Sequence, residues 1–170
     1  APRATAGARR TAKGACLGAG GRCALVNSCA SGAPYRFPAS GRADALILLD
    51  TSFLIRSLVA GSAQDRQLRH WLADQEPIGI SSIAWAEFLC GPVQPAMIEA
   101  VARFVTVRAA FDEDDALLAA QLFNGSGRRR GSLADCMIAA TAIRAQAALA
   151  TANVADFRRF CSAGLELATD

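Results

Sequence analysis

The feature that most constrains the fold is a run of five apolar residues, 45–49, that ends at an aspartate, Asp50. An uninterrupted apolar run of this kind is what a strand buried on both faces requires. Such strands lie inside parallel sheets that have helices above and below them. We therefore predict that residues 45–49 form the first and central strand of an α/β domain.

Strand and helix patterns alternate along the rest of the chain. Further strands are predicted over residues 78–80, 104–107, 148–151 and 165–168. Helices are predicted over residues 64–74, from Ser81 or Ser82 to Gly91, over 95–102, from the acids at 112–115 to the glycines at 125 and 127, over 132–147 and over 154–160. This alternation predicts a three-layer α/β/α domain with a central parallel sheet of four or five strands.

The first 43 residues differ from the rest in composition. They contain seven basic residues and no acid, are rich in Ala, Gly, Arg and Ser, and lack a periodic apolar pattern. We expect them to be disordered and favour the hypothesis that they are non-native upstream sequence, with an organellar transit peptide as the alternative. Deleting residues 1–43 without loss of fold or activity would support this hypothesis, and loss of either would contradict it. The domain is predicted to span residues 44–170.

Charge and cysteine content limit the function classes. Residues 44–170 hold 11 arginines and 15 acids, so the net charge of +3 comes from the first 43 residues and indicates no broad nucleic-acid or membrane surface on the domain. The six cysteines include no C-x-x-C pair and His70 is the single histidine, which argues against a zinc site. The cysteines are expected to be free thiols in a reducing cytosol.

Three polar positions have both a structural and a functional interpretation. Asp50 stands between a strand and a helix, where it would act as an N-cap worth about 1 kcal/mol. Asp135 follows Ser132 by three residues, as in a capping box. Asn153 is placed to cap the last short helix, with Asp156 at the third position of that helix. A purely structural role is therefore an alternative for each of these side chains.

Glu87 is harder to explain as a structural residue. It lies in the otherwise apolar helical run 83–89, and no cation stands three or four positions away. A buried carboxylate without a partner costs several kcal/mol, roughly, unless another group compensates its charge. The expectation that Glu87 is buried therefore points to a functional role.

The four polar positions are predicted to lie near one another in the fold. In an open parallel sheet the carboxyl ends of the strands and the following helix N-termini share one edge, and ligands bind there. Asp50, Asp135 and Asn153 or Asp156 are predicted at that edge, with Glu87 close to it. Several carboxylates at one edge repel one another unless a cation lies between them, and oxygen ligands favour Mg²⁺ or Mn²⁺ over zinc. The pattern thus predicts a metal site.

From about residue 45 to residue 168 the chain resembles a PIN domain, specifically the VapC-type toxin ribonucleases of prokaryotic toxin–antitoxin pairs. The matching pieces are Leu48–Ser52, Trp85–Glu87, Ala134–Ala140, Thr151–Asn153 and Asp156–Phe157. Their order and spacing agree with the family. The chain departs from it at Asn153, where the family usually has its fourth acid, so that either Asn153 serves as a neutral ligand or Asp156 takes the role.

The resemblance implies a cytoplasmic endoribonuclease that uses Mg²⁺, or Mn²⁺ as a substitute, to leave a 5′-phosphate and a 3′-hydroxyl. Asp50, Glu87, Asp135 and Asn153 are implied as metal ligands, with Asp156 among the catalytic residues. Thr51 or Ser52 is expected to orient a ligand or the attacking water. Residues Arg128, Arg129 and Arg130 are candidates for holding RNA phosphates, with a solvated loop as the alternative. A homodimer is implied, as is a VapB-like antitoxin whose tail fills the acidic groove.

Three other functions compete with this interpretation. A receiver-like signalling module would need a lysine near its phosphoryl group, and residues 44–170 contain no lysine. An aspartate-nucleophile phosphatase would need Asp-x-Asp after the first strand, but Ser52 stands at the third position. A catalytically weak PIN domain retained as a binding partner is the remaining alternative, which the substitution at Asn153 keeps open.

Overall fold

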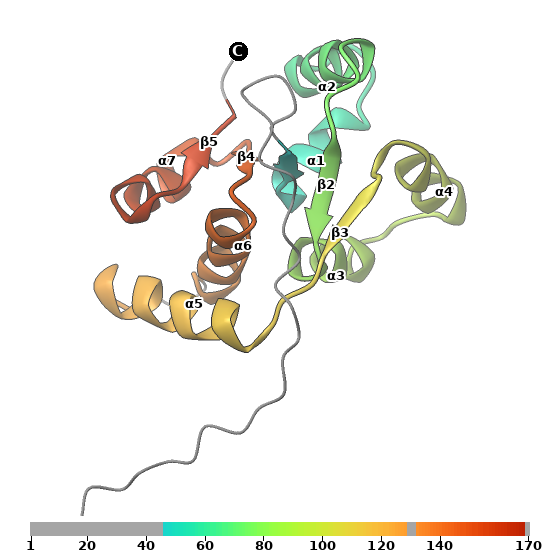
Figure 1. The fold of residues 1–170 in the computed structure, drawn as a ribbon. Coiled ribbons are helices and arrows are strands. Elements are labelled where there is room, and N and C mark those ends of the chain that lie inside the picture. Colours follow the sequence, from blue (N-terminus) through green and yellow to red (C-terminus); the bar gives the residue numbers. More distant parts are fainter. Residues whose placement is uncertain (1–45, 129–131, 169–170) are drawn as a thin grey trace, which may run out of the picture. The chain divides into compact units, whose positions relative to one another are not determined.

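The computed structural model of the chain describes residues 46–128 and 132–168 (Figure 1). Within these ranges five parallel strands form one sheet in the order β3-β2-β1-β4-β5, flanked by seven α-helices and one 3-10 helix. The predicted three-layer α/β/α class is therefore confirmed. The predictions for residues 1–43, Arg129 and Arg130 lie outside the described residues.

The first strand is central, as its apolar run predicts. The strands are β1 (Ile47–Leu49), β2 (Ile78–Ser81), β3 (Val107–Ala109), β4 (Ala148–Ala150) and β5 (Glu166–Leu167). In β1, Ile47 lies opposite Ile78 of β2 on one side and Ala148 of β4 on the other. Leu48 and Leu49 are almost completely buried, so β1 forms the middle of the hydrophobic core.

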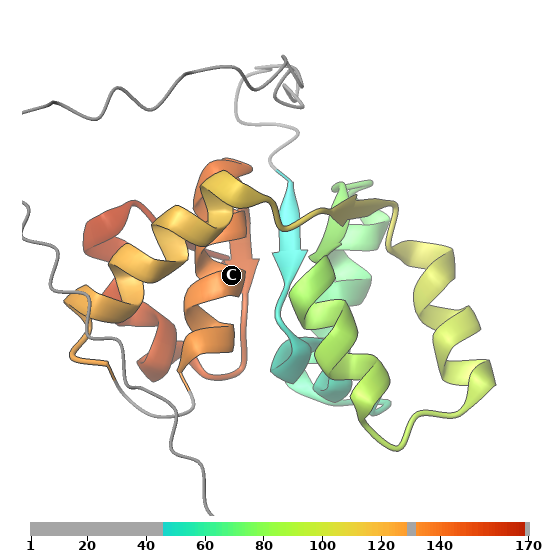
Figure 2. The same cartoon turned by 90° about the horizontal axis from the view of Figure 1, so that it is seen from below.

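The order of the strands places the helices on both faces of the sheet. The helices are α1 (Thr51–Ser57), α2 (Ala63–Ala73), α3 (Ser82–Cys90), α4 (Pro95–Phe104), α5 (Glu113–Gly125), α6 (Leu133–Arg144), α7 (Val154–Phe157) and the 3-10 helix η1 (Arg158–Ala163). The chain moves outward from β1 to β3, then crosses back to β4 and β5. Helices α1 and α2 connect β1 to β2, α3 and α4 connect β2 to β3, and α5 and α6 connect β3 to β4. Helix α6 packs against α5, α3, β2 and β4. Figure 2 shows the two halves of the domain on either side of β1.

Two predicted boundaries were wrong. Phe104 ends α4, and the strand predicted over 104–107 starts only at Val107, because the apolar residues at the end of α4 continue the buried face of that helix. The segment predicted as one helix over 154–160 forms two elements, the four-residue α7 and the start of the 3-10 helix η1. A separate helix, α1, also follows Asp50 directly, ahead of the helix predicted over 64–74.

Side-chain caps explain where several helices begin. Ser81 accepts a hydrogen bond from the backbone N–H of Ala84 and caps α3, which decides between the two serines considered. Asp112 and Asp115 form a reciprocal capping box at the start of α5, with both hydrogen bonds at 2.9 Å. The Ser81 cap starts α3 directly at the carboxyl end of β2, whereas the capping box of α5 lies beside Arg144, the last residue of α6.

Two further observations bear on the class of protein. Within residues 46–128 and 132–168, no helix is long and apolar enough to cross a membrane. The three cysteines in these ranges, Cys90, Cys136 and Cys161, are free thiols, as expected.

Gly79 in β2 is required by close packing. A Cβ at this position would lie 2.8 Å from Leu48 Cδ2 and 3.0 Å from Val107 Cβ. We expect Gly79→Ala to lower the free energy of unfolding by about 1–3 kcal/mol, since the neighbouring strands must move. Gly125→Ala is the control, because nothing lies within 4 Å of a Cβ there. Urea denaturation measures both changes, and equal stabilities of the two variants would contradict the prediction.

Candidate active site

Asp50 is held at the centre of the carboxyl edge of the sheet. Its backbone N–H donates to the carbonyl oxygen of Ala150 in β4 at 2.8 Å, and its side chain is the N-cap of α1. The residue is only 4% exposed. The predicted capping role is thus confirmed, and it fixes the direction in which the carboxylate points.

Two hydroxyl groups orient the Asp50 carboxylate through one of its oxygens. Asp50 Oδ2 accepts hydrogen bonds from the hydroxyls of Thr151, at 2.8 Å, and Ser52, and from the backbone N–H of Ser52 at 3.3 Å. The Ser52 hydroxyl also accepts from the backbone N–H of Ala152 at 3.1 Å. All three donors to Asp50 reach Oδ2, and Oδ1 has no hydrogen-bond partner among the described residues. Oδ1 is therefore the oxygen that remains for a ligand.

Glu87 is coupled to the same region through Thr51. The Thr51 hydroxyl donates to Glu87 Oε2 at 2.7 Å and lies 3.2 Å from the carbonyl oxygen of Ala84. The expected burial of Glu87 was wrong, because α3 buries Ala84 and Phe88 and leaves Glu87 on its exposed side. The carboxylate therefore keeps contact with water and needs no buried counter-charge. Its contact with Thr51 supports the predicted orienting role of that residue.

Asp135 lies in the first turn of α6 and faces η1. Helix α6 begins after Ser132 without the predicted capping box. The Asp135 carboxylate instead lies 3.5 Å from Nη2 of Arg159, and their side chains are 32% and 20% exposed. A partly buried carboxylate that meets one arginine at this distance is weakly compensated.

The pKa of Asp135 shows that three other acids act on this carboxyl group. Burial and then the negative charge of Asp50 raise the pKa of Asp135 from 3.8 to about 6. Asp156 and Glu87 raise it by smaller amounts, and the positive charge of Arg159 opposes them. The structure therefore brings the charges of Asp50, Glu87 and Asp156 within electrostatic reach of Asp135, as the sequence predicts.

The fourth position is divided between two residues. Asn153 is exposed and occupies the N-cap position of α7, but the capping hydrogen bond expected from its side chain is not formed. Its backbone N–H instead donates to the Thr151 hydroxyl at 3.0 Å. Asp156 is also exposed, and its charge acts on Asp135. The prediction that Asn153 or Asp156 is the fourth contributor to the site therefore stays a prediction.

The donor chemistry fits a hard divalent cation. Carboxylate oxygens are the preferred ligands of Mg²⁺ and Mn²⁺, and their mutual repulsion at Asp135 is what a cation would relieve. Within the described ranges, however, no three His, Cys, Asp or Glu side chains converge in the arrangement that holds a metal ion. In this conformation Asp135 faces Arg159, and Glu87 faces Thr51.

Two residues of the site were not assigned a role from the sequence. Thr151 stands in the Thr151–Asn153 segment quoted above, and its position as the last residue of the strand predicted over 148–151 was the available signal. No sequence pattern indicated a role for Arg159, because it is the η1 turn that brings this residue to Asp135. Of the three candidate RNA-binding arginines, Arg128 is described: it is exposed, and its Nε donates to Asn124 at 2.9 Å.

The raised pKa of Asp135 predicts how stability depends on pH. The folded protein holds the proton more tightly than the unfolded chain, so the stabilisation from protonated Asp135 is full below pH 3.8 and is lost as pH rises through about 6. Asp135→Asn has no such loss. In EDTA, the stability of Asp135→Asn relative to wild type should therefore increase between acidic and neutral pH. A difference in free energy of unfolding that stays constant across this range would contradict the prediction.

Comparison with known proteins identifies a family for this chain. The sequence profile of the PIN domain matches residues 47–162, more than half of the chain. The search of curated proteins gave no match. The matched segment contains every site residue named above from Asp50 to Arg159.

Solved structures share the fold. VapBC2 from Rickettsia felis, bound to a DNA fragment from its promoter, superposes with a TM-score of 0.58 at 21% identity, covering 72% of this chain and 97% of that chain. A toxin–antitoxin complex from Klebsiella pneumoniae gives 0.52 at 26% identity, covering 65% and 89%. VapC20 from Mycobacterium tuberculosis, a toxin that cleaves the sarcin-ricin loop, gives 0.50 at 20% identity, covering 73% and 99%.

Proposed function

The chain belongs to the PIN domain family, and from this premise we propose that it is a VapC-type toxin, a Mg²⁺-dependent endoribonuclease. One observation carries the proposal: Asp50, Glu87 and Asp156 all act on the pKa of Asp135 at the carboxyl edge of the sheet. A set of acids that repel one another is costly for a purely structural site, and a bound cation would compensate it.

The metal would be held by Asp50, Glu87 and Asp135, with Asn153 or Asp156 as a fourth contributor. When bound, Mg²⁺ would polarise the phosphate and lower the pKa of a water molecule for attack on phosphorus, leaving a 5′-phosphate and a 3′-hydroxyl. Mn²⁺, which accepts the same oxygen ligands, would substitute for it.

The chain's own residues prepare this site. Ser52 and Thr151 fix Asp50 so that Oδ1 is presented. Thr51 holds one oxygen of Glu87 and leaves the other for a ligand. Arg159 limits the repulsion that Asp135 experiences before a cation binds. Each carboxylate is thus oriented by a neighbour, and preorganised groups of this kind need little rearrangement during reaction.

The partner proposal follows from the relatives. The Rickettsia felis and Klebsiella pneumoniae structures are toxin–antitoxin complexes. We propose that this chain also binds an antitoxin of the VapB kind, whose basic tail would meet the exposed Glu87 and Asp156, and that it forms a homodimer. Opposite charge across such a contact would accelerate association and favour the right partner.

The catalytically weak PIN domain stays the alternative function. Asn153 is the observation that favours it, since a neutral side chain there lowers the charge available to a second cation. A folded chain that binds Mn²⁺ but leaves RNA intact would support this alternative.

The ends of the RNA products test the proposed chemistry. With Mg²⁺ and a mixed RNA pool, the products are expected to carry 3′-hydroxyls, which a poly(A) polymerase extends without prior phosphatase treatment. Attack by the RNA's own 2′-hydroxyl would instead leave cyclic phosphates that block extension. Products that are extended only after removal of such phosphates would overturn the metal-assisted hydrolysis proposed here.

Thr51 offers a more specific prediction. Thr51→Val keeps the shape of the side chain and removes the hydroxyl that donates to Glu87 at 2.7 Å. We expect RNA cleavage to fall about tenfold, the effect of losing one hydrogen bond to a charged group, with little change in fold. Thr51→Ser retains the hydroxyl and is the control. Equal cleavage rates for Thr51→Val and Thr51→Ser would contradict the role of the hydroxyl.

A further inference from the structure

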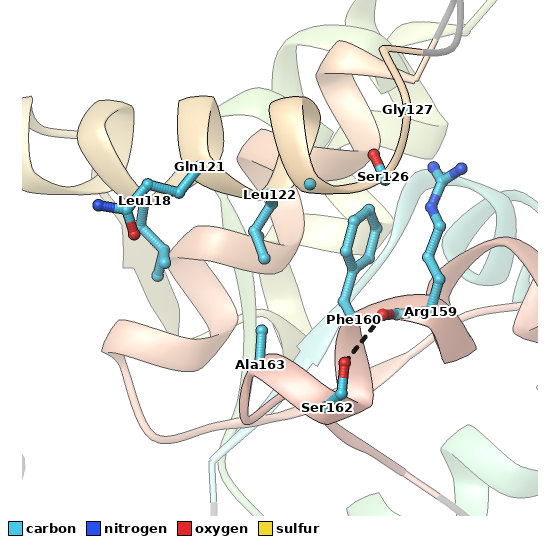
Figure 3. A pocket seen from close by; sticks show the side chains of 10 residues that line it. Leu118, Gln121, Leu122, Ser126, Gly127, Arg159, Phe160, Ser162 and Ala163 are labelled. Atoms are coloured by element: carbon cyan, nitrogen blue, oxygen red, sulfur yellow. Dashed lines mark hydrogen bonds between the residues drawn. The ribbon is translucent and has the colours of Figure 1, made fainter.

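A cavity of about 680 Å³ opens between the second half of α5 and η1 (Figure 3). None of the four acids of the candidate site lines it. One residue connects the two: Arg159 forms part of the cavity wall, and its guanidinium lies 3.5 Å from Asp135. The volume is in the range of pockets that bind small organic groups, roughly 300–1,000 Å³.

The lining of this cavity suits an anion. Of its ten lining residues none is acidic, and Arg159 is the one that carries a charge. Polar groups come from Gln121, Ser126 and Ser162, and apolar surface from Leu118 and Ala163. In a domain with more acids than bases, this cavity has no carboxylate in its wall to repel a phosphate.

Arg159 has donors that the protein leaves unused. Its Nε is buried and has no hydrogen-bond partner among the described residues. Its contact with Asp135 is long, and the guanidinium otherwise lies 4.6 Å over the ring of Phe160. An arginine has five N–H donors, which match the oxygens of a phosphate in pairs. A side chain with donors to spare, at the boundary between an acidic cluster and an acid-free cavity, is suited to bind such a group.

We propose that this cavity is an RNA subsite, which holds the nucleotide next to the cleaved bond while Arg159 binds a phosphate of that nucleotide. The inference rests on the proposed function, because the position of Arg159 beside Asp135 is what selects RNA over a protein partner. A phosphate held by Arg159 lies next to the acids at which hydrolysis takes place. Arg159 then acts on the substrate directly, in addition to its contact with Asp135.

RNA binding by the full chain tests the subsite. The probe is a short, fluorescently labelled single-stranded RNA, with Ca²⁺ in place of Mg²⁺ to prevent cleavage. Arg159→Gln removes the phosphate contact, and Ala163→Glu introduces an acid at an exposed position of the cavity wall. Arg158→Gln and Cys161→Glu are matched controls, since both residues are exposed, belong to η1 and do not line the cavity.

The expected result is a Kd about tenfold weaker for Arg159→Gln and for Ala163→Glu, with both controls within roughly twofold of wild type. Unchanged binding by Ala163→Glu, or a wild type that binds no RNA, would overturn the subsite. So would a changed oligomeric state of Ala163→Glu with normal RNA affinity, which would make the cavity a protein contact. Circular dichroism confirms that each variant is folded.

The same variants separate this inference from the proposed function. If wild type binds RNA through the cavity but cleaves none with Mg²⁺, the nuclease proposal fails and the subsite stands. If wild type cleaves RNA and both cavity variants bind and cleave normally, the nuclease proposal stands and the subsite is wrong.

Discussion

Asp50→Asn is expected to lower RNA cleavage by at least about a hundredfold, the range seen when one preorganised electrostatic group is lost from an active site. The reason is specific to the geometry. Asp50 Oδ2 accepts three hydrogen bonds, and Oδ1 is the oxygen that remains for a cation. An asparagine keeps its one oxygen for the hydroxyl donors and presents its NH2 group, a hydrogen-bond donor that does not bind a cation, in place of Oδ1.

Stability separates this loss of activity from a folding defect. Asp50→Asn retains an N-cap and an acceptor for Thr151, so its free energy of unfolding should stay within about 1 kcal/mol of wild type. Asp50→Ala removes both and should cost about 2–3 kcal/mol, because the cap is lost and two hydroxyls lose their acceptor. Urea denaturation of the two variants measures the difference. An asparagine variant that is fully active, or as unstable as the alanine variant, would contradict this account of Asp50.

Arg144→Gln is expected to destabilise the fold by about 2–4 kcal/mol. Arg144 ends α6 and contacts three acids at the start of α5, namely Asp112, Asp114 and Asp115. Asp115 is almost fully buried, and Arg144 Nη1 lies 2.8 Å from its Oδ1. Removing the cation leaves a buried carboxylate with its capping hydrogen bond alone, and an uncompensated buried charge is strongly destabilising. Asp135 of the candidate site lies in the first turn of α6, at the opposite end of the helix from Arg144, so cleavage per folded molecule should change little.

The same cluster supplies the control. Asp114 also contacts Arg144, at 3.1 Å, but its side chain is 71% exposed. Exposed ion pairs contribute roughly 0–1 kcal/mol, so Asp114→Asn should be close to wild type. Urea denaturation of the two variants compares them directly. If both variants lose the same stability, burial of Asp115 does not determine the strength of this contact.

The fold could be predicted from the sequence where one physical signal dominated. The apolar run before Asp50 requires burial on both faces, and it identified the central strand correctly. The boundary between α4 and β3 could not be predicted. Phe104 and Val105 are apolar in a way that fits the end of a helix or the start of a strand, and the short strands leave little periodicity to decide between them.

The sequence predicted which acids belong to the candidate site, but it did not predict which side chains contact them. The rule that parallel strands end at one edge brought Asp50, Asp135 and Asp156 together, and their effect on the pKa of Asp135 agrees with it. The prediction that Glu87 is buried was wrong. When both sides of a helix carry apolar residues, its composition does not reveal which side faces the core. Arg159 was missed because it reaches Asp135 through a 3-10 turn, which has no clear sequence pattern.

Cleavage of a mixed RNA pool by the full chain, first stripped with EDTA and then given Mg²⁺ or Mn²⁺, tests the central claim most directly. We expect no cleavage without metal and recovery of cleavage with either ion, because the carboxylate oxygens of Asp50, Glu87 and Asp135 suit both Mg²⁺ and Mn²⁺. Cleavage that persists in EDTA would contradict the claim that these acids form a metal-dependent ribonuclease site. A folded, metal-loaded protein that leaves the pool intact would contradict it as well.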